Sequence, residues 1–185
     1  MIRSVCVFMG SNAGADPIYR DAALDLGTAL GHRGLDLVFG GSHVGLMGKV
    51  ANAALAAGSS VVGVLPQVLS DRELAHESLT ELHIVDTMHD RKALMAERAD
   101  AFITLPGGLG TLEETFEVLT WGQLDIHRKP CGILNVGGYY DGLVSFLEHA
   151  GQQGFVRPQS SPLMIVEGEV ETLLDRLTAA TPRSS

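Results

Sequence analysis

Short apolar runs alternate along the chain with segments whose apolar residues recur at helical spacing. Because apolar residues in these runs mostly follow one another instead of alternating with polar ones, the runs are typical of strands buried on both faces, and we predict seven of them. They span residues 5–9, 35–39, 60–65, 82–85, 101–105, 132–136 and 163–166. Helical spacing joins Ile18 to Leu30, Leu112 to Leu119 and Val170 to Leu177. The alternation predicts an α/β fold, a doubly wound Rossmann-like domain with a parallel sheet of about seven strands.

The residues at the ends of the first predicted helix support this fold. Asp16 and Pro17 have the residue types that begin helices, and Gly34 has the type that follows their ends. No linker or internal repeat separates the predicted elements. We therefore expect a single nucleotide-binding domain over residues 1–180 and a flexible tail over residues 181–185.

Charge and composition restrict the partners. The chain has 185 residues, 45% of them hydrophobic, and a net charge of −9, which opposes binding to DNA or RNA. No apolar stretch reaches about 18 residues, so neither a membrane span nor a membrane partner is expected. Cys6 and Cys131 each lie in an apolar run, outside any metal-binding or redox motif. These features favour a cytoplasmic protein with reduced cysteines.

Glycine-rich segments follow three of the predicted strands, where ligands bind in parallel sheets. They are residues 10–14, 40–48 and 106–114. Glycines let the backbone approach a phosphate, and a following helix directs its amide groups toward the anion. Tight turns alone would also explain each segment. Residues 106–114 match neither the P-loop nor the dinucleotide-binding pattern, which disfavours an ATPase or a dehydrogenase.

Charged residues near these turns suggest chemistry on a sugar phosphate. Glu113 and Glu114 follow the third turn, and a carboxylate there can stabilise an oxocarbenium-like transition state or position water. Alternatively, Thr111 and Glu114 form a capping box at a helix start. Arg91 and Lys92 offer a forked contact to phosphate, although such a pair is usually solvated. The histidines show no metal-ligand spacing, so no metal is expected.

The motifs Pro106-Gly-Gly-x-Gly-Thr-x-x-Glu114 and Gly40-Gly-x-x-x-Gly-Leu-Met-Gly48 resemble the LONELY GUY family of cytokinin-activating phosphoribohydrolases. The resemblance runs from Val5 to about Leu147 and includes Met88-His-x-Arg-Lys-Ala93 and Asn135-Val-x-Gly-Tyr-Tyr140. It implies that an N6-substituted adenosine 5′-monophosphate and water give the free base and ribose 5-phosphate, without a cofactor. It also implies a homodimer with sites near the subunit interface.

The resemblance assigns roles residue by residue. Arg91 and Glu114 correspond to the catalytic pair. The residues that correspond to substrate contacts are Glu73, Lys92, Gly108, Leu109, Gly110, Thr111, Leu112, Glu113 and Thr120. From the other two glycine-rich turns we add Gly10, Ser11, Gly40 and Gly41 as expected substrate contacts. Ser42 and Phe39 depart from the residues common in the family, which leaves plain AMP open as a substrate.

Two alternatives remain at this point. A non-catalytic nucleotide or cofactor carrier or sensor could use the same loops, but it would not need a carboxylate such as Glu114 beside Arg91. A lysine decarboxylase, a label that many relatives carry, needs a Schiff-base lysine in a cofactor site, and none of the three lysines has that setting. The helical segment with Phe116 and Trp121 offers an apolar face to a second subunit, unless that face packs on the sheet.

Overall fold

Seven parallel strands form one sheet in the computed structural model, which describes residues 1–72, 74–156 and 164–180. Their order across the sheet is β4-β3-β2-β1-β5-β6-β7. The bounds are β1 (Ser4–Phe8), β2 (Asp36–Phe39), β3 (Val61–Pro66), β4 (Glu81–Val85), β5 (Ala101–Thr104), β6 (Cys131–Leu134) and β7 (Met164–Glu167). Each lies within two residues of the predicted run, so the predicted α/β fold is confirmed.

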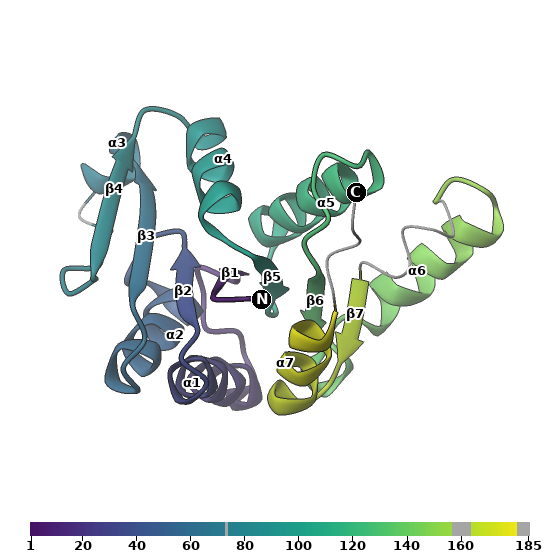
Figure 1. Ribbon diagram of the computed structural model, residues 1–185, viewed down its shortest axis with the longest axis horizontal. Helices are drawn as coiled ribbons and strands as arrows, with labels where there is room; N and C mark the ends of the chain where they lie inside the picture. The colour runs from purple at the N-terminus through teal and green to yellow at the C-terminus, as the bar shows by residue number, and fades with distance from the viewer. Residues whose placement is uncertain (73, 157–163, 181–185) are drawn as a thin grey trace.

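Helices cover both faces of this sheet (Figure 1). On one face α1 (Pro17–His32), α2 (Gly45–Ala56) and α7 (Val170–Ala179) pack on Val5 and Val7 of β1. On the other face α4 (Met88–Arg98) and α5 (Leu109–Gln123) pack on Cys6 and Phe8. Successive strand side chains point to opposite faces, so one strand supplies both cores. The remaining elements are α3 (Gln67–Ser70), η1 (Val136–Gly138) and α6 (Asp141–Gln152).

One predicted strand differs in its surroundings. β4 was expected to be buried, but it is an edge strand that pairs only with β3 among the described residues, and Leu82 and Ile84 are exposed. An apolar run gives no information on strand order, which explains the error. The predicted tail at 181–185 lies outside the described residues.

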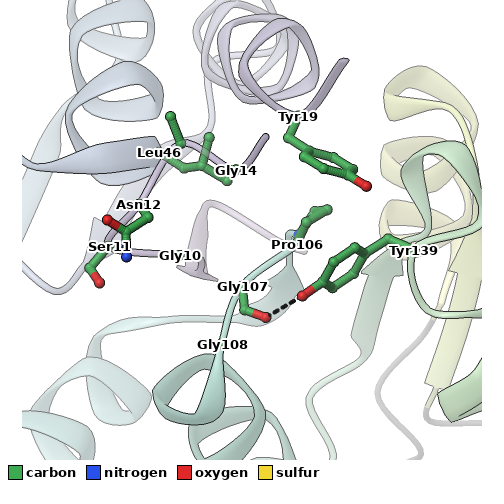
Figure 2. Close-up of a pocket in the computed structure, with 11 residues that line it drawn as sticks. Gly10, Ser11, Asn12, Gly14, Tyr19, Leu46, Pro106, Gly107, Gly108 and Tyr139 are labelled. Carbon is green, nitrogen blue, oxygen red and sulfur yellow. Dashed lines mark hydrogen bonds between the residues drawn. The ribbon is translucent and has the colours of Figure 1, made fainter. Parts of the chain in front are cut away.

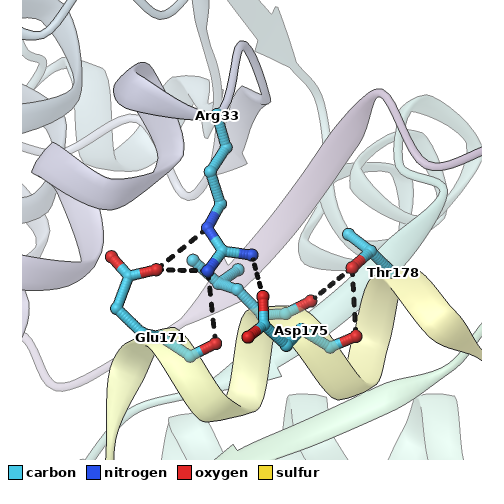
Figure 3. A network of polar contacts seen from close by, with 5 residues as sticks. Arg33, Glu171, Asp175 and Thr178 are labelled. Atoms are coloured by element: carbon cyan, nitrogen blue, oxygen red, sulfur yellow. Dashed lines mark hydrogen bonds and ion pairs between the residues drawn. The ribbon is translucent and has the colours of Figure 1, made fainter.

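The expected boundaries of α1 are confirmed. The Asp16 carboxylate accepts a hydrogen bond from the Ile18 N–H at 3.0 Å, Pro17 is the first helical residue, and Gly34 has a φ of +65° beyond the end. Arg33, between the helix and Gly34, donates to Asp175 at 2.7 Å and also binds Glu171 (Figure 3). These contacts join the end of α1 to α7 on the face of the sheet that both helices cover.

The three glycine-rich turns meet at the centre of the sheet. β2, β1 and β5 are neighbours, and the chain reverses its direction of travel across the sheet between β1 and β5. In doubly wound sheets the crevice at this switch point is where ligands bind. The Gly10 N–H donates to the Pro106 carbonyl at 3.1 Å, and the Leu46 N–H donates to the Gly10 carbonyl at 3.2 Å. The turn that contains Gly10 therefore contacts each of the other two turns.

Candidate active site

The turn after β5 leads directly into α5, and the capping-box interpretation of Glu114 is wrong. The helix begins at Leu109, with Gly108 as its N-cap and without a side-chain cap. Thr111 is therefore the third helical residue and Glu114 the sixth, in the second turn. In a capping box the glutamate is the third helical residue and accepts a hydrogen bond from the N-cap N–H group. A residue in the second turn is not at that position.

The residues at this helix start are exposed to solvent. A Cβ atom added at Gly108 or Gly110 would meet nothing within 4 Å, and Leu109 is 87% exposed. The first four N–H groups of a helix have no acceptor within the helix, and they favour an anion there. Thr111 is buried and Leu112 is half-buried, so the accessible part of the turn is Gly108 to Gly110.

Arg91 and Glu114 form a buried ion pair at the same edge of the sheet. Each residue is only 8% exposed, and Arg91 Nη1 lies 2.9 Å from Glu114 Oε1. Arg91 Nε also donates to the Val64 carbonyl of β3 at 3.1 Å. Burial raises the pKa of the Glu114 carboxyl above its ordinary value, although the facing guanidinium lowers it in part. The alternative interpretation, a solvated Arg91, is therefore wrong, because the structure buries this side chain against the sheet.

Gly40 touches this pair, and Gly41 does not. A Cβ atom added at Gly40 would lie 1.7 Å from Arg91 Nη2, so only glycine leaves room for the guanidinium. Gly41 is buried with a φ of +74°, and a Cβ atom added there would approach β3 and β4 instead. The sequence predicted both as ligand contacts, and it gave no indication that Gly40 packs against Arg91.

Lys92 forms a second buried cation beside the first. It is 8% exposed, and its ammonium group binds the carboxylates of Glu113 and, at 3.1 Å, Glu117. Burial disfavours the charged form of Lys92, but hydrogen bonds to both carboxylates outweigh burial and raise its pKa above the ordinary value. Lys92 therefore remains charged, with exposed Glu113 between it and solvent.

Gly10 and Ser11 border a cavity of about 240 Å³ on the α1 side of the switch point (Figure 2). Its other walls come from Tyr19, Leu46, residues 106–108 and Tyr139. Gly10 is buried and Ser11 is exposed. Both predicted residues therefore lie beside the turn that begins α5.

Two predicted contacts do not join this group. Thr120 is exposed near the far end of α5, eleven residues beyond Leu109, which is a rise of about 17 Å along the helix. Glu73 lies outside the described residues. Trp121, which was considered for a subunit interface, is half-buried and packs against the core beneath α5, while Phe116 is half-buried on the same helix.

Sequence reasoning gave no role to two tyrosines that contact the turn. The Tyr139 hydroxyl donates to the Gly107 carbonyl at 2.7 Å, and the Tyr140 hydroxyl donates to the Leu105 carbonyl at 2.8 Å. The segment Asn135 to Tyr140 was noticed only as part of the family resemblance. Its contact with a turn more than thirty residues earlier depends on β5 and β6 being neighbours.

Over residues 1–72, 74–156 and 164–180, no group of three or more His, Cys, Asp or Glu side chains could hold a metal ion. No helix in that part of the chain has the length and apolar character needed to cross a membrane. Cys6 and Cys131 are free and buried, as expected.

Known proteins resemble this chain in sequence. A family model described as a possible lysine decarboxylase matches residues 47–177. The probable cytokinin riboside 5′-monophosphate phosphoribohydrolase LOGL2 of Oryza sativa subsp. japonica is 48% identical over 98% of this chain and 74% of its own length. The cytokinin riboside 5′-monophosphate phosphoribohydrolase LOG1 of Arabidopsis thaliana is 47% identical over 98% of this chain and 85% of its own.

Solved structures share the fold at lower identity. A molybdenum cofactor binding protein from Rippkaea orientalis has a TM-score of 0.72 and 22% identity, with 97% of both chains covered. The molybdenum cofactor carrier protein of Chlamydomonas reinhardtii has a TM-score of 0.70 and 19% identity, covering 97% of this chain and 100% of that one. At such identities the likeness shows a common fold and does not indicate a shared ligand.

Proposed function

This chain belongs to the family of cytokinin riboside 5′-monophosphate phosphoribohydrolases, and we propose that it hydrolyses N6-substituted adenosine 5′-monophosphates to the free base and ribose 5-phosphate. The observation that carries this proposal is the buried Arg91–Glu114 pair, in which Glu114 lies on the helix whose exposed, glycine-rich start follows β5. Together they offer a site for a phosphate and a carboxylate for the sugar.

In this proposal the substrate's phosphate lies at the start of α5. The N–H groups of Gly108, Leu109 and Gly110 donate to its oxygens, and the helix adds a favourable field. Lys92 balances the charge of Glu113 and Glu117, which would otherwise repel the phosphate. Gly10 and Ser11 border the same turn and complete the phosphate and ribose contacts.

Glu114 and Arg91 act on the glycosidic bond. As the C1′–N bond breaks, the ribose ring develops positive charge, which the Glu114 carboxylate stabilises. The same carboxylate accepts a proton from the water whose hydroxyl group bonds to C1′. The base leaves with the electron pair of the C1′–N bond and takes up a proton from solvent at that nitrogen, and Glu114 then returns its proton to solvent. Arg91 orients Glu114 through the 2.9 Å hydrogen bond, and its charge lowers the carboxyl pKa and so favours the ionised form that burial opposes.

The direct test is product analysis with purified protein. We expect isopentenyladenosine monophosphate to yield free base and ribose 5-phosphate, and we expect slower hydrolysis of AMP. If neither nucleotide yields free base or ribose 5-phosphate, the proposed function is contradicted. Tight nucleotide binding without turnover would favour a carrier instead.

A decarboxylase does not fit the lysines of this chain. A Schiff-base lysine requires an ammonium group that readily loses its proton. Lys92 has a raised pKa and two carboxylate partners. Lys129 precedes β6, at the opposite edge of the sheet from the glycine-rich turns, and donates to the Ala96 carbonyl at 2.7 Å. Lys49 is exposed on α2.

The proposed role of Glu114 predicts an acid limb in the pH profile. Only the ionised carboxylate accepts a proton, and it is ionised above its pKa, which burial raises. We therefore expect kcat/KM to fall as the pH decreases, with a midpoint above the ordinary glutamate pKa. The rate would be measured from acidic to neutral pH. A midpoint at or below that ordinary value would contradict the assignment.

We propose that the protein is a cytoplasmic homodimer. In this dimer the second subunit covers apolar side chains that are exposed after α5 and on α6 of the monomer. Leu124 and Ile126 follow α5, and Phe146 of α6 is 62% exposed, while no residue of α6 is buried. Light scattering should give twice the 19.6 kDa monomer mass. Phe146→Glu should lower that mass, whereas Val68→Glu, on exposed α3, should not. A monomer at micromolar concentration would contradict the dimer.

A further inference from the structure

Three consecutive carbonyl groups before Gly108, the N-cap of α5, each accept a hydrogen bond from outside the turn. The Leu105 carbonyl accepts from the Tyr140 hydroxyl at 2.8 Å, and the Pro106 carbonyl accepts from the Gly10 N–H at 3.1 Å. The Gly107 carbonyl accepts from the Tyr139 hydroxyl at 2.7 Å. Two of these three bonds come from adjacent tyrosines of the Asn135 to Tyr140 segment.

A peptide unit is planar and trans, so a carbonyl and the N–H that follows it point in opposite directions. The bond from Tyr139 to the Gly107 carbonyl therefore directs the Gly108 N–H away from Tyr139. Figure 2 shows this carbonyl pointing to Tyr139, with Ser11 on the opposite side of the turn. The Leu105–Pro106 peptide has no N–H, so Tyr140 directs no amide in this way.

The Gly107–Gly108 peptide needs such a restraint. Neither residue has a side chain to restrict rotation, so the peptide could turn its carbonyl toward a bound anion. A carbonyl oxygen there would repel a phosphate, whereas an N–H group attracts it. The direction of this one peptide thus decides whether the turn favours or opposes an anion.

The Tyr139 ring is positioned independently of its hydroxyl. Its edge-to-face neighbours are Tyr19, at 5.5 Å between ring centres, and Tyr140, at 4.8 Å. The preceding turn contains Gly137 and Gly138 with φ of +58° and +73°, and Asn135 accepts the Tyr140 N–H at 2.6 Å. Removal of the hydroxyl should therefore leave the ring in place.

We propose that Tyr139 is a positioning residue that, through the Gly107 carbonyl, directs the Gly108 N–H toward the 5′-phosphate of the substrate. The inference rests on the proposed function for the identity of the anion. It assigns Tyr139 to phosphate affinity and leaves bond cleavage to Arg91 and Glu114.

The test compares Tyr139→Phe with Tyr140→Phe, which removes the same hydroxyl group from the neighbouring tyrosine. Calorimetry should show that Tyr139→Phe raises the Kd of ribose 5-phosphate about tenfold, the effect expected when one hydrogen bond no longer orients a donor. KM for the nucleotide should rise by a similar factor with kcat nearly unchanged, and inhibition by the free base should not change. Tyr140→Phe should lower the melting temperature without weakening ribose 5-phosphate binding.

The outcomes separate this inference from the proposed function. An unchanged Kd in Tyr139→Phe, or an equal loss in both variants, overturns the positioning role, because an equal loss indicates general loosening of the turn. Failure of the wild-type protein to bind ribose 5-phosphate also overturns it. Wild-type binding with the expected difference between variants, but without hydrolysis of any nucleotide, supports the positioning role and refutes the hydrolase.

Discussion

Glu114→Gln is expected to lower kcat by roughly 100-fold or more, in line with the loss of single catalytic groups elsewhere. Glutamine has nearly the same shape as glutamate, and its amide oxygen can still accept the hydrogen bond from Arg91 Nη1. It carries no negative charge for the developing oxocarbenium ion, and it does not accept a proton from water. KM should change little, because the amide groups of Gly108 to Gly110 are untouched. Steady-state kinetics with the prenylated nucleotide would measure both constants.

Two further variants separate chemistry from stability. Glu114→Ala leaves the buried Arg91 guanidinium without its carboxylate and should destabilise the fold by about 3 to 5 kcal/mol, the usual result of breaking a buried pair. The melting temperature of Glu114→Gln should stay closer to that of the wild type. Glu97→Gln makes the same chemical change on the exposed face of α4 and should alter neither property. Near-normal turnover in Glu114→Gln would move the catalytic assignment to another carboxylate, such as Glu113.

The fold could be predicted from local patterns because the strands are mostly apolar runs and α1 has Asp16 and Gly34 at its ends. The environment of β4 could not, since its apolar residues resemble those of a central strand and only the strand order exposes them. The spacing analysis also did not outline α2, α4 or α6, and α6 is a helix without buried residues. The burial of an element depends on its neighbours in the fold, and a short stretch of sequence does not show which elements those are.

The candidate site shows the same limit more sharply. Thr111 and Glu114 fit a capping box in sequence, yet the real partner of Glu114 is Arg91, 23 residues earlier on another helix. The solvated interpretation of Arg91 and Lys92 failed for the same reason, since their carboxylate partners lie on α5. Gly40 and Tyr139 gained structural roles only when β2, β1, β5 and β6 were arranged side by side. The glycine-rich turns themselves were recognisable, because glycine at a strand end is a local signal.

The close contact between Gly40 and Arg91 predicts the second large effect. A methyl group at residue 40 would begin 1.7 Å from Arg91 Nη2, so Gly40→Ala must displace the guanidinium. Gly40 has no positive φ, and the atom that must move is the end of a flexible side chain, so the fold should survive. Displacement would break the contacts of Arg91 with Glu114 and Val64, so we expect a folded protein with a lower melting temperature.

Because a misplacement of about 1 Å in an active site can cost 100-fold in rate, we expect Gly40→Ala to lower kcat/KM by roughly that factor. Gly142→Ala is the matched control, since a Cβ atom added there meets nothing within 4 Å and the helix should if anything gain stability. If Gly40 acts only through the Arg91–Glu114 pair, combining Gly40→Ala with Glu114→Gln should lower the rate little further than Glu114→Gln alone, because residues that act as a unit give non-additive effects. Multiplied losses in the double variant would instead show that Gly40 contributes through a separate contact with the substrate.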